Sequence, residues 1–203
     1  MIEPDARLRG RPRSETCRAA ILTAAGELML EGGLAAATME AIAARAGVSK
    51  ATIYKWWPSR GAVALDGLLA RVSDSLIVPE GVPARVALQV QIAALISLFT
   101  DSTTGQLLRA LVATAQSDPE IARALRERWI SPRRAVAAEI VRAGIVRGEI
   151  RPDTDVAAAV DQLFAPVYHR LLFGHDQLDT SLAAIVVGNL LDGVGVSASV
   201  DSI

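Results

Sequence analysis

The feature that most constrains this chain is a twenty-residue segment, TMEAIAARAGVSKATIYKWW, which runs from Thr38 to Trp57. Its first half has apolar residues at helical spacing and begins with Thr38, a good N-cap. Gly47 supplies the backbone freedom for a tight turn, and Ser49 then caps a second short helix over Lys50–Trp56. The core between the two helices is filled by small or branched residues: Ile42, Ala43, Val48 and Ile53. The segment therefore predicts a helix-turn-helix.

The second helix of this segment has the chemistry needed to read DNA. A helix this short fits the major groove with its early residues at base edges, and its N-terminus suits a phosphate. Lysine can reach a guanine or a phosphate, threonine and alanine can touch a thymine methyl, and a tyrosine hydroxyl can donate to a phosphate. The candidate DNA-binding residues are Arg11, Arg13, Thr38, Ser49, Lys50, Ala51, Thr52, Tyr54, Lys55 and Arg60. The alternatives left open are that Lys55 contacts a phosphate rather than a base, and that the hairpin is structural.

Charge is distributed unevenly along the chain. Residues 1–60 carry nine basic and six acidic residues, whereas the remainder is net negative by four. Such asymmetry favours an anionic partner for the first part. Residues 1–13, with a basic residue at every second position from Arg7 to Arg13, are expected to be a flexible basic arm that tracks a phosphate backbone or is simply solvated.

The segment resembles the DNA-binding domain of the TetR/AcrR family of repressors. The matching residues are Thr38, Ile42, Ala43, Ala46, Gly47, Val48, Ser49, Thr52, Ile53, Tyr54, Pro58 and Ser59. Trp56 and Trp57 replace the usual His or Tyr and Phe, and Arg60 replaces the usual Lys, so the chemical type is kept. The resemblance implies a homodimeric repressor that binds a palindromic operator in double-stranded DNA and is released from it by a small-molecule effector.

The rest of the chain predicts an all-α fold. Helices are expected at about 60–76, 84–100, 104–116, 119–148, 153–173 and 179–195, with helix starts at Asp118 and Asp153. Pro132 and Pro166 should kink or interrupt their helices. Together with the resemblance, this gives about nine helices: the flexible basic arm at 1–13, a three-helix helix-turn-helix DNA-binding domain at 14–60, and a helical ligand-sensing and dimerisation domain at 61–203.

Two further sets of residues follow from the apolar patterns of this second domain. The candidate ligand pocket lies among the helices at 84–129 and the start of 153–173, and its residues are Leu95, Phe99, Arg109, Val112, Trp129, Phe164, Tyr168 and His169. The last two long helices are apolar on more than one face, which favours a two-fold four-helix interface. The candidate interface residues are Val160, Val167, Leu171, Ile185, Val186, Asn189 and Leu190. The alternative is that the apolar faces of these two helices pack only within the core of one chain.

Other functional classes have little support in the sequence. No Gly-rich phosphate loop, nucleophile elbow or His-Glu-x-x-His pattern occurs, so the chain is not expected to be an enzyme, and no cofactor is expected. His169 and His175 lack the spacing of two metal ligands on one helical face, so no metal site is expected. A single cysteine, Cys17, and the expectation of no membrane span favour the cytoplasm. The alternative function is a small all-helical ligand-binding protein or enzyme whose N-terminal hairpin is structural.

Overall fold

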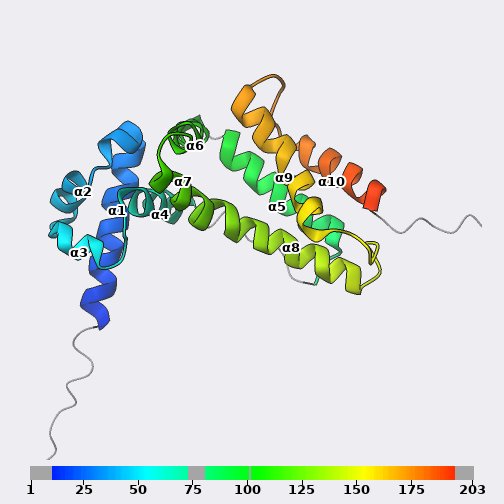
Figure 1. Cartoon of the computed structure of the whole chain (residues 1–203), viewed down its shortest axis with the longest axis horizontal. Coiled ribbons are helices and arrows are strands. Elements are labelled where there is room, and N and C mark those ends of the chain that lie inside the picture. The colour runs from blue at the N-terminus through cyan, green and yellow to red at the C-terminus, as the bar shows by residue number, and fades with distance from the viewer. Residues whose placement is uncertain (1–10, 73–80, 101, 195–203) are drawn as a thin grey trace, which may run out of the picture. The chain divides into compact units, whose positions relative to one another are not determined.

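The computed structural model describes residues 11–72, 81–100 and 102–194. Every regular element among them is a helix, which confirms the predicted all-α class (Figure 1). The chain forms two compact units. Unit 1 comprises Met1–Ser73 and Ala110–Trp129, and unit 2 comprises Asp74–Arg109 and Ile130–Ile203. Helix α6 (Ser102–Ala115) and the π-helix η3 (Arg126–Ile130) have residues in both units.

Unit 1 is built around α1 (Arg11–Ala36), which packs against α2 (Met39–Ala46) and α4 (Arg60–Val72). Helix α3 (Lys50–Tyr54) contacts α2, and α7 (Pro119–Leu125) contacts α4. Gly33 has a φ of 62° and interrupts the helical backbone of α1 near its C-terminal end. Buried apolar side chains hold the helices together: Ile21, Ala25, Met29, Ile42, Ile53, Trp57, Leu65 and Leu68.

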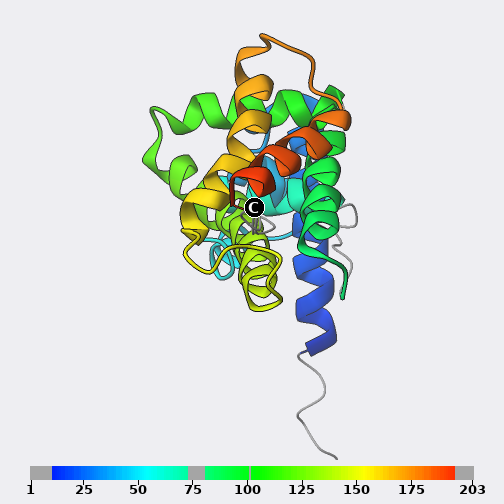
Figure 2. The ribbon, with the colours of Figure 1, turned by 90° about the vertical axis from the view of Figure 1, so that its right-hand side faces the viewer.

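Unit 2 contains α5 (Ala84–Thr100), α8 (Ser131–Val146), α9 (Val156–Phe173) and α10 (Ser181–Val194). Helix α10 packs against both α5 and α9, and α8 packs against the same two helices. Figure 2 shows this arrangement from a second side, with the red-orange α10 between the green α5 and the yellow α9. The core of unit 2 is aliphatic, with Leu88, Ile92, Leu95, Ile96, Val141, Leu163, Val167 and Val187 buried.

Some helix boundaries differ from the expected ones. Helix α9 begins at Val156, not Asp153, because Asp155 is the residue whose carboxylate accepts from Ala157 N at 2.9 Å and Ala158 N at 3.0 Å. The start at Asp118 is confirmed, since its carboxylate accepts from the amides of Glu120 and Ile121.

The two prolines behave differently from each other. Pro132 lies in the first turn of α8, where a missing amide hydrogen costs little, and the hydrogen-bond pattern before it is that of the π-helix η3. Pro166 lies inside α9, which continues through it to Phe173, so the predicted interruption is wrong, whereas a kink at Pro166 stays a prediction. Buried neighbours such as Leu163 and Val167 anchor the helix on both sides, which offsets the roughly 3 kcal/mol that an internal proline costs.

Candidate DNA-binding surface and ligand cavity

The turn between α2 and α3 is fixed by local side-chain and backbone contacts. The Thr38 hydroxyl accepts from Ala41 N at 3.1 Å and caps α2. Gly47 then takes the left-handed conformation, with φ 66°. The Ser49 hydroxyl accepts from Thr52 N at 3.2 Å and caps α3. Caps of this kind contribute about 1 kcal/mol each. The residues that predicted the helix-turn-helix, Thr38, Gly47 and Ser49, are therefore the ones that form its caps and its turn.

Buried apolar side chains pack beneath the inner face of α3. Ile53 and Trp57 are fully enclosed, and the ring of Trp57 meets the ring of Trp56 edge-on at 5.9 Å. The Trp57 indole Nε1 donates to an Asp66 carboxylate oxygen at 2.7 Å, and the Arg128 guanidinium donates to the same oxygen. Trp57, on the segment that follows α3, is therefore tied to α4 and to η3 through one partly buried carboxylate.

The sequence did not reveal this Asp66 contact. Asp66 and Arg128 lie 62 residues apart, and neither belongs to the helix-turn-helix pattern. The only signal available was a carboxylate on the otherwise apolar start of α4.

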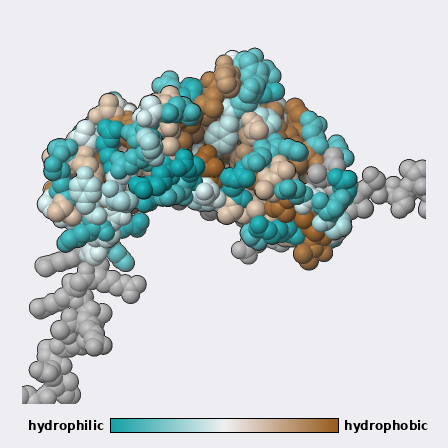
Figure 3. All heavy atoms as spheres, in the orientation of Figure 1, coloured by the Kyte–Doolittle hydropathy of each residue, from teal (hydrophilic) through white to brown (hydrophobic). Residues whose placement is uncertain are grey.

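The outer face of α3 carries most of the candidate DNA-binding side chains. Lys50, Ala51 and Lys55 are exposed, and Tyr54 is 54% exposed. Thr52 and Arg60 are half-buried. Thr38 and Ser49 are engaged as caps, and the side chains of Arg11 and Arg13 lie outside the described residues, although their backbone belongs to α1. In the view of Figure 3, the surface over α2 and α3 is largely pale or teal.

Lys50 has an ionic partner within the chain. Its Nζ lies 2.6 Å from a carboxylate oxygen of Glu40, on α2. The hydrogen bond from Lys50 lowers the pKa of Glu40, and the same contact raises the pKa of Lys50. Both groups therefore stay charged at neutral pH, and a DNA phosphate at this position would compete with Glu40 for the ammonium group.

A second ionic cluster joins the helices of unit 1. Arg45 donates two hydrogen bonds to Glu31, at 2.6 and 2.8 Å, and lies 4.0 Å from Glu27. Glu27 in turn pairs with Arg71 at 3.3 Å, so the cluster connects α1, α2 and α4. The hydrogen bond from Arg45 lowers the pKa of Glu31. Because these groups are exposed, the cluster contributes little to stability, and its main effect is on the orientation of the three helices.

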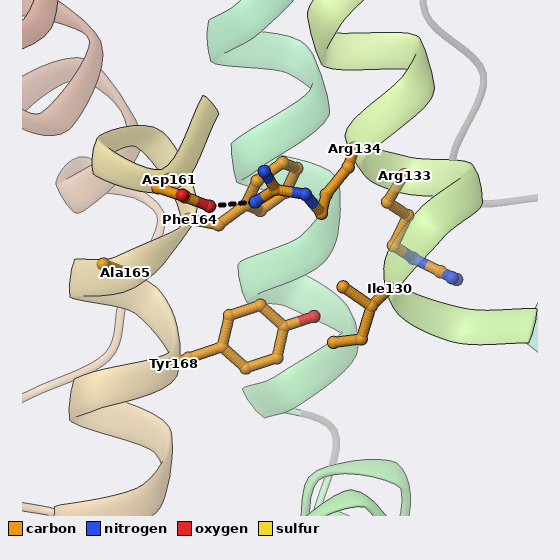
Figure 4. A pocket seen from close by; sticks show the side chains of 7 residues that line it. All are labelled: Ile130, Arg133, Arg134, Asp161, Phe164, Ala165 and Tyr168. Atoms are coloured by element: carbon orange, nitrogen blue, oxygen red, sulfur yellow. Dashed lines mark hydrogen bonds and ion pairs between the residues drawn. The ribbon is translucent and has the colours of Figure 1, made fainter. Parts of the chain in front are cut away.

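A cavity of about 300 Å³ lies within unit 2, between α8 and α9. Figure 4 shows its two walls. One carries Ile130, Arg133 and Arg134, and the other carries Asp161, Phe164, Ala165 and Tyr168. Arg134 reaches across and donates to the Asp161 carboxylate. Burial lowers the pKa of Arg133 to about 10, although the nearby Tyr168 acts in the opposite direction.

Of the residues predicted for a pocket, Phe164 and Tyr168 line this cavity and the others do not. Leu95 and Phe99 are buried in α5, where the Phe99 ring meets the Tyr168 ring at 5.4 Å. Arg109 is exposed and donates to Leu171 O at 3.4 Å. Val112 and Trp129 belong to unit 1, and Trp129 is fully buried there.

His169 is exposed, with its ring 5.0 Å from that of Phe173 and 4.4 Å from that of His175. His169 was predicted to line the pocket, but its side chain does not line this cavity. The sequence missed Ile130, Arg133 and Arg134 because the expected pocket did not include the start of α8. It also missed Asp161 and Ala165, which lie on α9 between the residues that it did name.

The predicted interface residues separate into two groups. Five of them are buried inside the single chain, where they are core side chains: Val160, Val167, Leu171, Val186 and Leu190. Ile185, at 55% exposure, and Asn189 face outward. Leu172 and Phe173, which the sequence did not single out, are also exposed apolar residues, at 40% and 73%. Of these apolar residues, only the outward ones therefore remain at the surface of the single chain.

Among the described residues, no group of three or more His, Cys, Asp or Glu side chains could hold a metal ion. One helix in the same part of the chain, Ser14–Ala36, is long and apolar enough to cross a membrane by length and composition alone. Its apolar side is occupied by the packing of unit 1, where Ile21, Leu28 and Met29 are buried.

Comparison with known proteins gives consistent results for both halves of the chain. Residues 21–66 match the family model for bacterial regulatory proteins of the tetR family, and residues 78–190 match the model for the tetracyclin repressor-like C-terminal domain. YdeS, an uncharacterized helix-turn-helix-type transcriptional regulator of Bacillus subtilis strain 168, is 38% identical over 96% of this chain and 98% of its own.

Solved structures agree with this. The crystal structure of the TetR family transcription regulator SCO0332 is 45% identical, with a TM-score of 0.77 over 88% of this chain and 98% of that chain. FadR from Bacillus subtilis, solved in complex with stearoyl-CoA, has a TM-score of 0.61 over 87% of this chain and 98% of that chain. Its identity is 22%, so that likeness is one of fold.

Proposed function

The chain belongs to the TetR family of helix-turn-helix transcriptional regulators, and from this premise we propose that it is a homodimeric repressor. As a dimer it would occupy a palindromic operator in double-stranded DNA, with one α3 in each of two successive major grooves. A small molecule bound in the C-terminal helices would release it. The protein would act in the cytoplasm, by binding rather than by catalysis.

The observation that carries this proposal is the presentation of α3. Its N-terminus is held by the Ser49 cap, its inner side by Ile53 and Trp57, and its outer side exposes Lys50, Tyr54 and Lys55. A rigid short helix with cationic and hydroxyl groups on its open side suits both base edges and phosphates. We assign DNA binding to residues within 14–60, which include this helix.

The ligand-sensing and dimerisation roles are assigned to helices within 61–203. The cavity between α8 and α9 supports the first role, and the exposed apolar residues of α9 and α10 support the second. In Figure 3 the larger hydrophobic patches lie over the helices of unit 2. To release DNA, the ligand must bind the DNA-incompetent conformer more tightly, by roughly 1–3 kcal/mol.

The proposal is tested by selecting bound fragments from random duplex DNA and footprinting the enriched ones. Enrichment of an inverted repeat that is protected on two successive major grooves is the expected result. Enrichment of no sequence at moderate salt would contradict specific operator binding. Protection of a single half-site without a symmetric second one would contradict only the dimeric arrangement, and not specific binding.

A further inference from the structure

The chain has two histidines, His169 and His175, and their rings meet at the C-terminal end of α9. The ring centres lie 4.4 Å apart with 58° between the planes, and both side chains are exposed. By sequence alone the pair is not expected to bind a metal, because six residues do not separate two ligands on one helical face. That reasoning does not apply here, since α9 ends at Phe173 and His175 lies beyond it.

The backbone at the end of α9 brings the two rings together. Gly174 takes the left-handed conformation, with φ 61°, and its amide donates to Arg170 O at 2.9 Å. A glycine in this conformation turns the chain back across the helix end, so that the residue after it packs against the last turn. The Arg170 guanidinium then holds the returning segment, because it donates to Gln177 O at 2.5 Å and lies 3.0 Å from an Asp176 carboxylate oxygen. His175 is therefore fixed on both sides, by Gly174 before it and by these contacts after it.

The spacing of the two rings fits neighbouring ligands of one metal ion. With metal–nitrogen bonds of about 2.1 Å and about 1.1 Å from nitrogen to ring centre, two imidazoles at a right angle have ring centres about 4.5 Å apart. A tetrahedral angle would need about 5.2 Å, so the observed 4.4 Å agrees better with the right angle. Right-angled nitrogen ligands are typical of Cu²⁺ and Ni²⁺. The torsion that turns a histidine ring has broad preferences, so each exposed ring can aim a nitrogen at an ion between them.

The surroundings of the histidine pair are compatible with a divalent cation. The last carbonyl groups of α9 give this end of the helix a partial negative charge, which favours a cation. Two arginines nearby are already engaged: Arg170 is paired with Asp176, and Arg109 donates to Leu171 O at 3.4 Å. The histidines supply two ligands, so water would complete the coordination shell and the ion would exchange with solvent.

We propose that His169 and His175 chelate one divalent late transition metal ion, of the class of Ni²⁺ or Cu²⁺, at the C-terminal end of α9. The site is separate from the cavity between α8 and α9, whose lining includes neither histidine. It goes beyond the proposed function, and metal binding can be measured without DNA.

The test is isothermal titration of the full-length protein, produced without a polyhistidine tag, with nickel chloride. We expect one equivalent to bind with a dissociation constant in the micromolar range. His169→Gln and His175→Gln should each weaken binding by more than about tenfold, the least that loss of even an outer-shell group typically costs. Cys17→Ser is the control and should leave binding unaltered, because Cys17 is the one thiol of the chain and lies on α1.

Pulsed electron paramagnetic resonance of the Cu²⁺ complex of Cys17→Ser then counts the imidazoles on the ion through their remote ring nitrogens. Two are expected, and both must come from this pair because the chain has no other histidine. A signal from one imidazole or none would overturn the inference, and this measurement keeps both histidines in place. So would nickel binding that is undiminished in His175→Gln, or the absence of nickel binding at millimolar concentration.

Discussion

At the scale of single residues, the proposed DNA-binding side of α3 carries a lysine that is paired with an acid of the same chain. Glu40 lies 2.6 Å from Lys50, and both side chains are more than half exposed. An exposed pair of this kind adds little to stability, so its main consequence is for binding. If the proposed DNA contact forms, Lys50 would exchange Glu40 for a phosphate, and the carboxylate of Glu40 would stay close to the DNA as a repulsive charge.

We therefore predict that Glu40→Gln strengthens binding to non-operator duplex DNA. The variant removes a negative charge and frees Lys50, so the slope of log affinity against log salt should steepen by up to about one. Fluorescence anisotropy over a salt series measures both effects. Glu139→Gln makes the same change of charge on α8, where it frees Arg142, and should leave DNA affinity unaltered. An equal gain in both variants would show that net charge alone, and not Lys50, is responsible.

At the scale of elements, Asp66 joins the segment after α3, α4 and η3 through one oxygen atom. Its side chain is 18% exposed and that of Arg128 is 27% exposed, so the pair is largely out of water. The fully buried Trp57 uses the same carboxylate for its only polar atom. Loss of the charge leaves a partly buried guanidinium without its acid and an indole with a weaker acceptor.

Asp66→Asn should lower the free energy of unfolding by about 2 kcal/mol, since it replaces a charge-assisted contact at a partly buried site. Urea unfolding followed by tryptophan fluorescence measures the change. Asp192→Asn is the control, because Asp192 is 78% exposed and lies 3.7 Å from Arg85, so about 0.5 kcal/mol or less is expected. Similar losses in the two variants would contradict the structural role of Asp66.

Helices α1 and α4 approach so closely that a methyl group does not fit between them. A Cβ atom at Gly67 would lie 2.7 Å from Ala25 Cβ and 2.9 Å from Leu22 O. Gly67→Ala should therefore destabilise the protein by about 1–3 kcal/mol, despite the better helix propensity of alanine. Thermal unfolding measures this. Gly188→Ala in α10 meets only an Arg85 nitrogen at 3.8 Å and should be neutral or stabilising, so a gain in stability at Gly67 would show that the helices can separate freely.

The elements also show which parts of the structure can be read from the sequence. The caps at Thr38, Ser49 and Asp118 were predictable because each depends on amides within three residues of the capping side chain. The Asp66–Arg128 contact and the cavity walls depend on residues brought together by packing, which periodicity does not reveal. The same limit explains the interface prediction, because an apolar stripe does not distinguish a core face from a partner face.

At the scale of the whole molecule, the proposed dimerisation would use the apolar residues that α9 and α10 leave exposed. The buried side of α10 is used by α5 and α9, with Leu182, Val187 and Leu190 enclosed. Ile185 stays 55% exposed on the same helix, and Phe173 stays 73% exposed at the end of α9. Large apolar residues that remain in water are suited to burial against a second copy of the chain.

Ile185→Glu should therefore convert the proposed dimer into a monomer, because each two-fold interface would bury two new carboxylates without partners. Sedimentation equilibrium measures the mass, and operator affinity should fall with it, since one recognition helix would then bind alone. Val146→Glu places the same charge on α8 at a residue that is 87% exposed, and should change neither property. A dimer of undiminished stability in Ile185→Glu would exclude this face of α10 from the interface and direct attention to the exposed end of α9, where Phe173→Glu makes the equivalent test.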